Sequence, residues 1–262
     1  MKTAFIDGSA GTTGLRIHER LADRRDLSLL ILPDECRKDP AARAEALRKA
    51  DVAFLCLPDD AARESVSLAG DSNVVIIDTS TAHRTDPAWA YGFPELGYRD
   101  AIKASRRIAN PGCHASGFLA LVAPLTKAGL LAKEEALTCF SLTGYSGGGK
   151  KMIAEYEDEQ RDVLFDAPRQ YGLSQKHKHL PEMSVIGGLE KLPVFCPIVA
   201  PYYAGMEVTV PLFKHQLRGT KDDVAAVYAE TFKTGLVRFK GEESEGGLLS
   251  AGAYALDRKS VV

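Results

Sequence analysis

The first half of the chain alternates short apolar runs with stretches of helical composition, and this alternation constrains the fold more than any other feature. Strands buried on both faces have continuous apolar sequences, and a strand–helix alternation builds parallel sheets. The pattern therefore predicts an α/β fold with a doubly wound parallel sheet. The runs expected to be strands are Thr3–Asp7, Ser28–Leu32, Val52–Leu57, Val74–Asp78 and Arg107–Ala109. The stretches expected to be helices are Gly14–Leu21, Ala41–Lys49 and Ala61–Ala69.

In the second half the apolar runs follow one another with fewer helices between them. This arrangement predicts an α+β domain with a mostly antiparallel sheet. With 262 residues, the chain is long enough for two domains. We place a Rossmann-type domain at residues 1–112 and a domain for substrate binding and oligomer contacts at 113–262. The expected strands are Leu137–Thr143, Val194–Val199, Glu207–Phe213 and Leu236–Lys240, and the clearest helix is Asp222–Lys233, with Thr220 as its cap.

Composition excludes several classes of partner. The formal net charge is −2 and the charges are mixed in sign, so we expect neither nucleic acid nor an anionic membrane as a partner. Five cysteines without a Cys-x-x-Cys pair suit a reducing compartment and argue against disulfides and a bound metal. The chain opens directly on a strand pattern, and no apolar run approaches the ~20 residues that span a bilayer. We therefore expect a cytoplasmic protein without a signal peptide.

A glycine-rich turn follows the first predicted strand. Gly8, Gly11 and Gly14, with Thr12 and Thr13 between them, stand where the first helix begins. Glycines allow a sharp turn and a close approach to a pyrophosphate, which the helix N-terminus then holds. The spacing is G-x-x-G-x-x-G, whereas G-x-G-x-x-G is commoner. Its place at the first strand–helix junction predicts a dinucleotide site, and the alternative is a simple tight turn.

The end of the second strand bears on which dinucleotide binds. A free ribose 2′-hydroxyl usually meets an acidic residue there, whereas a 2′-phosphate requires cations. Arg37 and Lys38 favour NADP, but the neighbouring Asp34 and Glu35 weaken that inference. The alternative is a solvated loop of mixed charge.

Cys113 is the candidate nucleophile. It follows Asn110-Pro111-Gly112 and precedes an apolar run, which places its sulfur in the first turn of a helix. Unpaired N–H groups and the helix dipole favour an anion there, so we expect the thiol to lose its proton easily and attack as a thiolate. The alternative is a small hydrophobic side chain at a helix start.

Two later segments carry further polar groups. Ser146, Gly147 and Lys150 belong to a glycine-rich loop after a predicted strand, which could cradle an anion but lacks the P-loop spacing. The segment His177-Lys178-His179-Leu180-Pro181-Glu182 offers two histidines without a third metal ligand in register. We therefore favour one of these histidines as the acid–base partner of the thiolate. The alternatives are a flexible loop and exposed histidines.

Taken together, these segments resemble the N-acetyl-γ-glutamyl-phosphate reductases, in particular the shorter of that family's two subtypes. The matching segments are Gly8–Gly14, Asp78–Arg84, Asn110–Cys113, Ser146–Lys150 and His177–Glu182, and they occur in the family's order. The Asn-Pro-Gly-Cys turn is also similar to that of aspartate-semialdehyde dehydrogenase. The resemblance implies arginine biosynthesis, an NADPH-dependent reaction and a dimer or tetramer.

The resemblance also implies roles for particular residues. The Cys113 thiolate attacks N-acetyl-glutamyl 5-phosphate, phosphate leaves, and hydride reduces the thioester until N-acetylglutamate 5-semialdehyde is released. Either His177 or His179 moves the proton, and Asn110 with nearby N–H groups holds the oxyanion. The remaining roles fall to two sets. Substrate binding is assigned to Arg84, Ser146, Gly147, Lys150 and Glu182, and cofactor binding to Pro58 and Ser80 beside the glycine turn.

The end of the chain departs from the family pattern. After a segment like Gly246–Ser250 the family adds a strand and a helix that returns to the cofactor domain, and residues 257–262 do not resemble that continuation. Two alternatives therefore accompany the reductase: an enzyme like aspartate-semialdehyde dehydrogenase, and a truncated, inactive NADP-binding protein.

Overall fold

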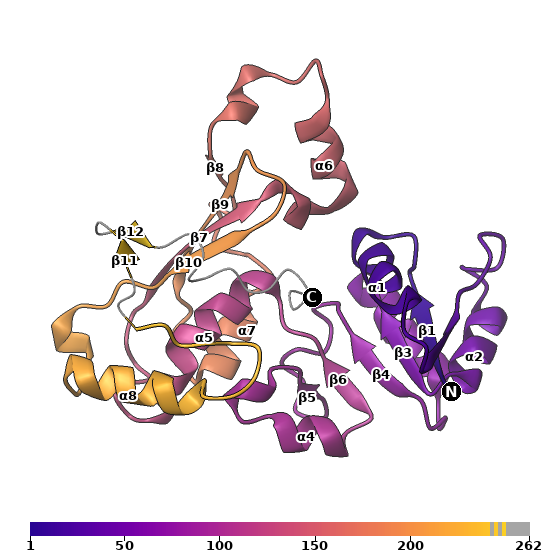
Figure 1. The fold of residues 1–262 in the computed structure, drawn as a ribbon, viewed down its shortest axis with the longest axis horizontal. Coiled ribbons are helices and arrows are strands. Elements are labelled where there is room, and N and C mark those ends of the chain that lie inside the picture. Colours follow the sequence, from indigo (N-terminus) through magenta and orange to yellow (C-terminus); the bar gives the residue numbers. More distant parts are fainter. Residues whose placement is uncertain (242–243, 246–247, 250–262) are drawn as a thin grey trace.

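Six parallel strands form the first half of the protein (Figure 1). The computed structural model describes residues 1–241, 244–245 and 248–249. The strand order is β2-β1-β3-β4-β6-β5, and every neighbouring pair is parallel. This confirms the predicted doubly wound sheet. The strands are β1 (Lys2–Asp7), β2 (Leu27–Leu30), β3 (Val52–Leu55), β4 (Val75–Asp78), β5 (Ala90–Tyr91) and β6 (Arg107–Ala109).

The helices between these strands cover both faces of the sheet. The chain runs from β1 outward to β2 and then returns past β1 to β3, so right-handed crossovers place the first helix on one face and the next two on the other. The second and third helices accordingly pack against each other. The strand order reverses between β1 and β3, the usual position of a ligand crevice. The helices are α1 (Thr12–Ala22), α2 (Pro40–Lys49), α3 (Asp59–Ala69) and, beyond β5, η1 (Pro94–Leu96) and α4 (Arg99–Ala104).

A second sheet of four strands lies beside the first (Figure 1). Its order is β10-β7-β9-β8, with the central β7–β9 pair parallel and both outer pairs antiparallel. The α+β prediction is thus confirmed, although the longest pairing of the sheet is parallel. The strands are β7 (Thr138–Gly144), β8 (Arg169–Gln170), β9 (Val194–Ala200) and β10 (Met206–Thr209).

One predicted strand is wrong. Leu236–Lys240 forms no regular element, because its backbone is held by a side chain instead of a neighbouring strand: the Leu236 N–H donates to Glu95 Oε1 at 2.9 Å. The predicted helix before it is confirmed as α8 (Lys221–Thr231), with Thr220 and Asp223 forming a capping box.

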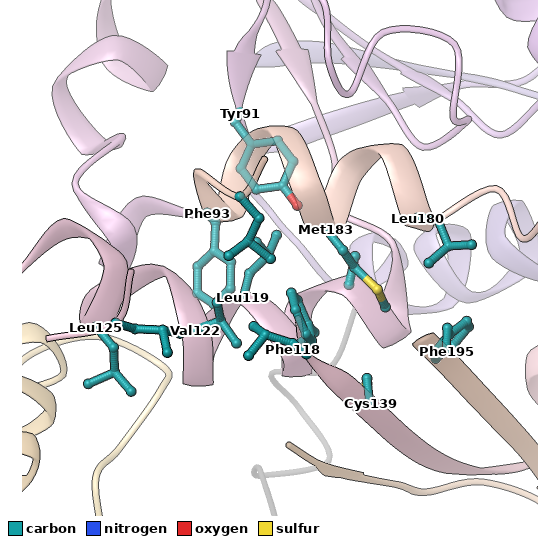
Figure 2. Close-up of a cluster of buried hydrophobic side chains, with 14 residues drawn as sticks. Tyr91, Phe93, Phe118, Leu119, Val122, Leu125, Cys139, Leu180, Met183 and Phe195 are labelled. Carbon is teal, nitrogen blue, oxygen red and sulfur yellow. The ribbon is translucent and has the colours of Figure 1, made fainter. Parts of the chain in front are cut away.

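The core of the second half is built around α5 (Cys113–Lys127). Figure 2 shows Phe118 and Leu119 of this helix among side chains from β7, β9 and α7 (Leu180–Gly187), with Tyr91 and Phe93 entering from the first half. At Gly117 a Cβ atom would lie 2.5 Å from Val208 Cγ2, so only glycine lets α5 lie this close to β10. Because α5 is packed on all these sides, its first turn is rigidly placed.

The remaining elements are shorter, and one segment, carrying α6, stands out from the body of the molecule (Figure 1). They are η2 (Tyr145–Gly148), α6 (Gly149–Glu157), η3 (Val163–Asp166), η4 (Lys214–Gln216), β11 (Ser244–Glu245) and β12 (Leu248–Leu249). The domain boundary at 112/113 stays a prediction; β6 ends at Ala109 and α5 begins at Cys113. The expectation about the chain after residue 249 lies outside the described residues. None of the described helices is long and apolar enough to cross a membrane.

Candidate active site

The glycine turn after β1 has the geometry that a dinucleotide site requires. Gly8 has a φ of +87°, and a Cβ there would lie 2.3 Å from the Cys56 carbonyl oxygen. A Cβ on Gly14 would lie 2.4 Å from the Gly8 carbonyl oxygen. The Gly11 N–H donates to that same oxygen at 3.1 Å. Gly8 and Gly14 therefore allow the tight turn and the close packing of α1 against it.

A cavity of about 470 Å³ opens at this turn, where the strand order reverses. Gly8, Gly11 and Pro58 line it together with Arg37 and Lys38, as predicted for a cofactor site. Thr12 and Thr13 begin α1 behind the turn. Ser80 is not among the residues that line this cavity. Glycines at a helix N-terminus let the backbone approach a phosphate closely, and Arg37 and Lys38 beside them supply positive charge. This lining fits the phosphates of a dinucleotide.

The arginines around the cavity differ in whether their guanidinium groups are available to bind a phosphate. Arg37 lies 3.5 Å from Asp34 and is 43 % exposed at its side chain, so an incoming phosphate can still reach it. Arg43, which the sequence did not single out, also lines the cavity. Its buried guanidinium is already bound to Asp7 at 3.1 Å and Glu64 at 2.5 Å. Arg43 therefore stabilises the wall of the cavity by joining Asp7 to Glu64.

Ser80 lies at the end of β4 within a separate buried network. Its hydroxyl donates to Asp78 Oδ2 at 2.7 Å, and the same carboxylate oxygen lies 2.7 Å from His83 Nδ1. The His83 ring stacks on Trp89 with centroids 4.0 Å apart. This network shapes the loop that leads to Arg84.

A buried carboxylate supports the turn before Cys113. Glu182 of α7 accepts the Gly112 N–H at 2.8 Å and the Tyr91 hydroxyl at 2.6 Å, both at Oε1. Its Oε2 lies 3.1 Å from Arg84 Nη1. Arg84 also donates to the Asn110 and Thr79 carbonyl oxygens, each at 2.9 Å. Arg84 and Glu182, predicted as substrate ligands, therefore hold the turn in place.

Cys113 begins α5 as predicted, but the expectation that its thiol has a lowered pKa is wrong. The residue is exposed, yet the protein packed around its sulfur raises the pKa of the thiol by desolvation. The backbone N–H groups of His114 and Cys113 lower the pKa, and so do the charges of Arg84 and Lys178, but they do not outweigh that cost. The helix N-terminus stabilises the thiolate without making it the dominant form.

The structure separates the two candidate histidines. His179 is buried, its pKa is lowered to about 2 chiefly by desolvation, and its Nδ1 has no hydrogen-bond partner among the described residues. His177 is half-buried, and its Nδ1 accepts the His179 N–H at 3.2 Å. Burial also lowers the pKa of His177. The neutral His177 ring must therefore carry its proton on Nε2.

A third histidine joins this cluster, which the sequence analysis missed. His114 is 3 % exposed and lies between Ser141 of β7 and Tyr171, which follows β8. Its ring centroid is 5.8 Å from that of His177 and 5.6 Å from that of His179. The one signal in the sequence was that His114 directly follows the candidate nucleophile. The sequence does not show that Ser141 and Tyr171 are its partners.

The predicted anion cradle after β7 uses its N–H groups elsewhere. The N–H of Ser146 donates to the Tyr203 carbonyl oxygen at 2.9 Å, and that of Gly149 donates to the Ser146 carbonyl oxygen. Gly147 packs near Thr143, and Lys150 lies in the first turn of α6. The first of these hydrogen bonds joins the loop to the turn between β9 and β10. Its role in binding substrate stays a prediction.

Comparisons with known proteins follow the two halves of the structure. The semialdehyde dehydrogenase NAD binding domain matches residues 33–105, and the semialdehyde dehydrogenase dimerisation domain matches residues 113–244. The N-acetyl-gamma-glutamyl-phosphate reductase of Rhizobium meliloti is 50 % identical over 217 residues, which is 81 % of this chain and 70 % of that protein. The Brucella ovis protein of the same name is 49 % identical over 229 residues, covering 86 % and 74 %.

Solved structures show the same fold at lower identity. Aspartate semialdehyde dehydrogenase II from Vibrio cholerae, complexed with ASA, matches with a TM-score of 0.65 and 17 % identity over 94 % of this chain and 84 % of its own. Aspartate semialdehyde dehydrogenase with NADP from Candida albicans matches with a TM-score of 0.60 and 17 % identity, covering 87 % and 75 %.

Proposed function

The chain belongs to the semialdehyde dehydrogenase family, within its N-acetyl-gamma-glutamyl-phosphate reductases, and we propose from this premise how its residues carry out that reduction. The activity is that of an oxidoreductase of arginine biosynthesis. The solved relatives named for aspartate semialdehyde share only 17 % identity with the chain, so they support the fold and not that substrate. The relatives at about half identity favour the acetylglutamyl substrate.

The mechanism rests on the position of Cys113, which follows the carboxyl end of β6 in the parallel sheet. The glycine turn, Pro58 and the Asn110 turn all follow the carboxyl ends of parallel strands, which lie at one edge. Cys113 therefore lies on the same side of the sheet as the cofactor cavity, although it is not among the residues that line that cavity. Bound there, NADPH would supply the hydride.

Cys113 attacks the acyl carbon of N-acetyl-glutamyl 5-phosphate as a thiolate. A carbon–sulfur bond forms, the carbon–oxygen bond to phosphate breaks, and Cys113 holds the acyl group as a thioester. After the carbonyl is reduced, the Nε2–H of the neutral His177 ring donates a hydrogen bond to the negative oxygen, which keeps its charge until it re-forms the carbonyl. When the hemithioacetal collapses, the carbon–sulfur bond breaks and the semialdehyde leaves. Asn110 contributes an amide hydrogen to the developing oxyanion.

The reverse reaction tests this assignment. Purified protein is assayed for NADP reduction with N-acetylglutamate semialdehyde in the presence and absence of phosphate. Phosphate-dependent turnover that Cys113→Ser abolishes is expected, and Cys196→Ser, which changes a half-buried thiol on β9, is the matched control. Turnover that survives in Cys113→Ser would refute the thioester. Faster turnover with aspartate semialdehyde would overturn the substrate.

For the cofactor, we propose NADP, held through its 2′-phosphate by Arg37 and Lys38. Both side chains line the cavity where the second strand's loop approaches the glycine turn. A hydrogen bond to a charged group contributes about 1.5–3 kcal/mol, so losing one lowers affinity by roughly tenfold or more. Arg37→Ser with Lys38→Ser should therefore weaken NADPH binding by roughly 100-fold and leave NADH binding unchanged in titrations of cofactor fluorescence. Equal losses for both cofactors would contradict the assignment.

The match to a dimerisation domain indicates a homo-oligomer. We propose that a second copy covers the outer face of the four-stranded sheet. This face lies opposite α5 and exposes Phe140 and Val194, which are 42 % and 53 % exposed, beside Leu142 and Ile198. Phe140→Asp should halve the mass measured by light scattering. Val163→Asp, at an equally apolar exposed position on η3, is the control.

A further inference from the structure

The buried chain of hydrogen bonds behind Cys113 ends at a tyrosine hydroxyl. His114 Nδ1 lies 2.7 Å from Ser141 Oγ, and His114 Nε2 lies 2.8 Å from the Tyr171 hydroxyl. Desolvation lowers the pKa of His114 to about 4, so its ring is neutral at neutral pH. A neutral imidazole has one donor nitrogen and one acceptor nitrogen. The ring therefore accepts a hydrogen bond from one of the two hydroxyls and donates one to the other.

Donor accounting decides that direction. Ser141 is fully buried, and within the described residues His114 is the one side chain that forms a hydrogen bond with its hydroxyl. If His114 carried its proton on Nδ1, the Ser141 O–H would be buried without an acceptor, which is unfavourable. With the proton on Nε2, Ser141 donates to Nδ1 and Nε2–H donates to the Tyr171 oxygen. This arrangement uses every donor of the chain except the Tyr171 O–H.

The free O–H of Tyr171 belongs to the surroundings of Cys113. The tyrosine contacts His114, the residue after the nucleophile, and its ring centroid lies 6.0 Å from that of His177. The charge of a Cys113 thiolate adds to desolvation in raising the pKa of Tyr171 to about 12, so the phenol keeps its proton at neutral pH. A neutral phenol beside a nucleophilic sulfur offers one hydrogen bond to an oxygen bound there.

We propose that Tyr171 is a further catalytic residue, whose O–H donates to the substrate oxygen that becomes negative at Cys113, and that Ser141 and His114 are positioning residues that orient this O–H. The inference rests on the proposed thioester mechanism. With His114 Nε2–H donating to the Tyr171 oxygen, the hydrogen of that hydroxyl is left for an incoming oxygen. Such a donor acts most strongly on the charge that develops during the reaction.

Tyr171→Phe tests the catalytic role, because it removes only the hydroxyl. Loss of one oxyanion donor lowers kcat by roughly 10²-fold. We expect that loss with little change in KM and NADPH affinity, and with an unchanged pH profile for alkylation of Cys113. Tyr228→Phe is the matched control, since it removes a tyrosine hydroxyl that donates to the Leu121 carbonyl oxygen in the α8–α5 contact. It should retain wild-type kcat.

The outcomes separate the possible failures. Wild-type protein without turnover would refute the proposed function. Active wild-type protein with an equally active Tyr171→Phe variant would overturn the present inference alone. A shifted alkylation profile in that variant would place the hydroxyl on the sulfur instead of the substrate, and would also overturn it.

The positioning role has its own readout, which needs no substrate. In whole protein with ¹⁵N-labelled histidine, two-bond nitrogen–proton correlations identify the protonated ring nitrogen. We expect His114 to carry hydrogen on Nε2 in the wild type and to lose this preference in Ser141→Ala. Ser141→Thr, which keeps a hydroxyl, should restore the preference and the kcat lost in Ser141→Ala. A wild-type His114 protonated on Nδ1 would overturn the proposal.

Discussion

Gly112→Ala is the sharpest test of the packing beneath Cys113. Gly112 has a φ of −73°, which alanine adopts without strain, so any effect must come from the added methyl group. That Cβ would lie 2.4 Å from His179 Nε2 and 2.5 Å from Arg84 Nη1. These distances are roughly 1 Å short of an ordinary contact. Both neighbours are buried, at 4 % and 8 % exposure, so the turn itself must move.

The expected cost of Gly112→Ala follows from this displacement. Overpacking of a tight site destabilises by about 1–3 kcal/mol, and a shift of about 1 Å in a reacting group lowers turnover by roughly 10²-fold. The control is Gly129→Ala at the other end of α5, where φ is +73° and no heavy atom lies within 4 Å of the Cβ. It should lose about 1–2 kcal/mol through left-handed strain and keep its kcat.

Urea unfolding and the NADP-reduction assay measure both quantities for the two variants. If Gly112→Ala kept at least half of the wild-type kcat/KM, the turn would not be held as tightly as these contacts indicate. If Gly129→Ala lost activity to the same extent, the loss would follow general instability and not the position of the sulfur.

Three further substitutions test buried charges. Glu182→Gln should destabilise by about 3 kcal/mol in urea unfolding, because Arg84 is left buried without its counter-charge; a loss below 1 kcal/mol would contradict this. Arg43→Met should cost a similar amount in the same measurement, because Asp7 is then left buried without its counter-charge, and a loss below 1 kcal/mol would contradict this as well. Because the pKa of His114 is lowered to about 4 in the folded protein, the unfolded chain takes up that proton first as the pH falls. The free energy of unfolding should therefore decrease between about pH 6.5 and pH 4. His114→Gln should reduce the slope of this free energy against pH by up to about 1.4 kcal/mol per pH unit.

The fold of the first half could be predicted because five of its six strands are local apolar runs, whereas β5, a two-residue strand at the sheet edge, was missed. Strand ends moved by one or two residues, as at Val52–Leu57, which ends as a strand at Leu55. The segment Leu236–Lys240 has the composition of a strand, but no strand within the described part of the chain pairs with it. Pairing depends on distant parts of the chain, so composition alone could not reveal this.

The candidate site divides in the same way. Cys113 and the glycine turn are visible in the sequence because each needs only a few adjacent residues to do its work. The Tyr171–His114–Ser141 chain joins a residue after β8, the start of α5 and the middle of β7. Nothing local in any of these segments marks them as partners. The pKa of Cys113 was mispredicted for a related reason, because the desolvation around its sulfur comes from surrounding chain that the Pro-Gly-Cys motif does not contain.

The charges around Cys113 suit a thiol that must both attack and leave. Glu182 beneath the turn would repel a thiolate, but its pairing with Arg84 cancels that charge. Arg84 and Lys178 lower the pKa of the thiol, while desolvation raises it more. A thiolate of higher pKa is the stronger nucleophile but the poorer leaving group. In the proposed mechanism, desolvation therefore favours attack on the acyl phosphate, and the cations, with the N–H groups of α5, favour release of sulfur when the hemithioacetal collapses.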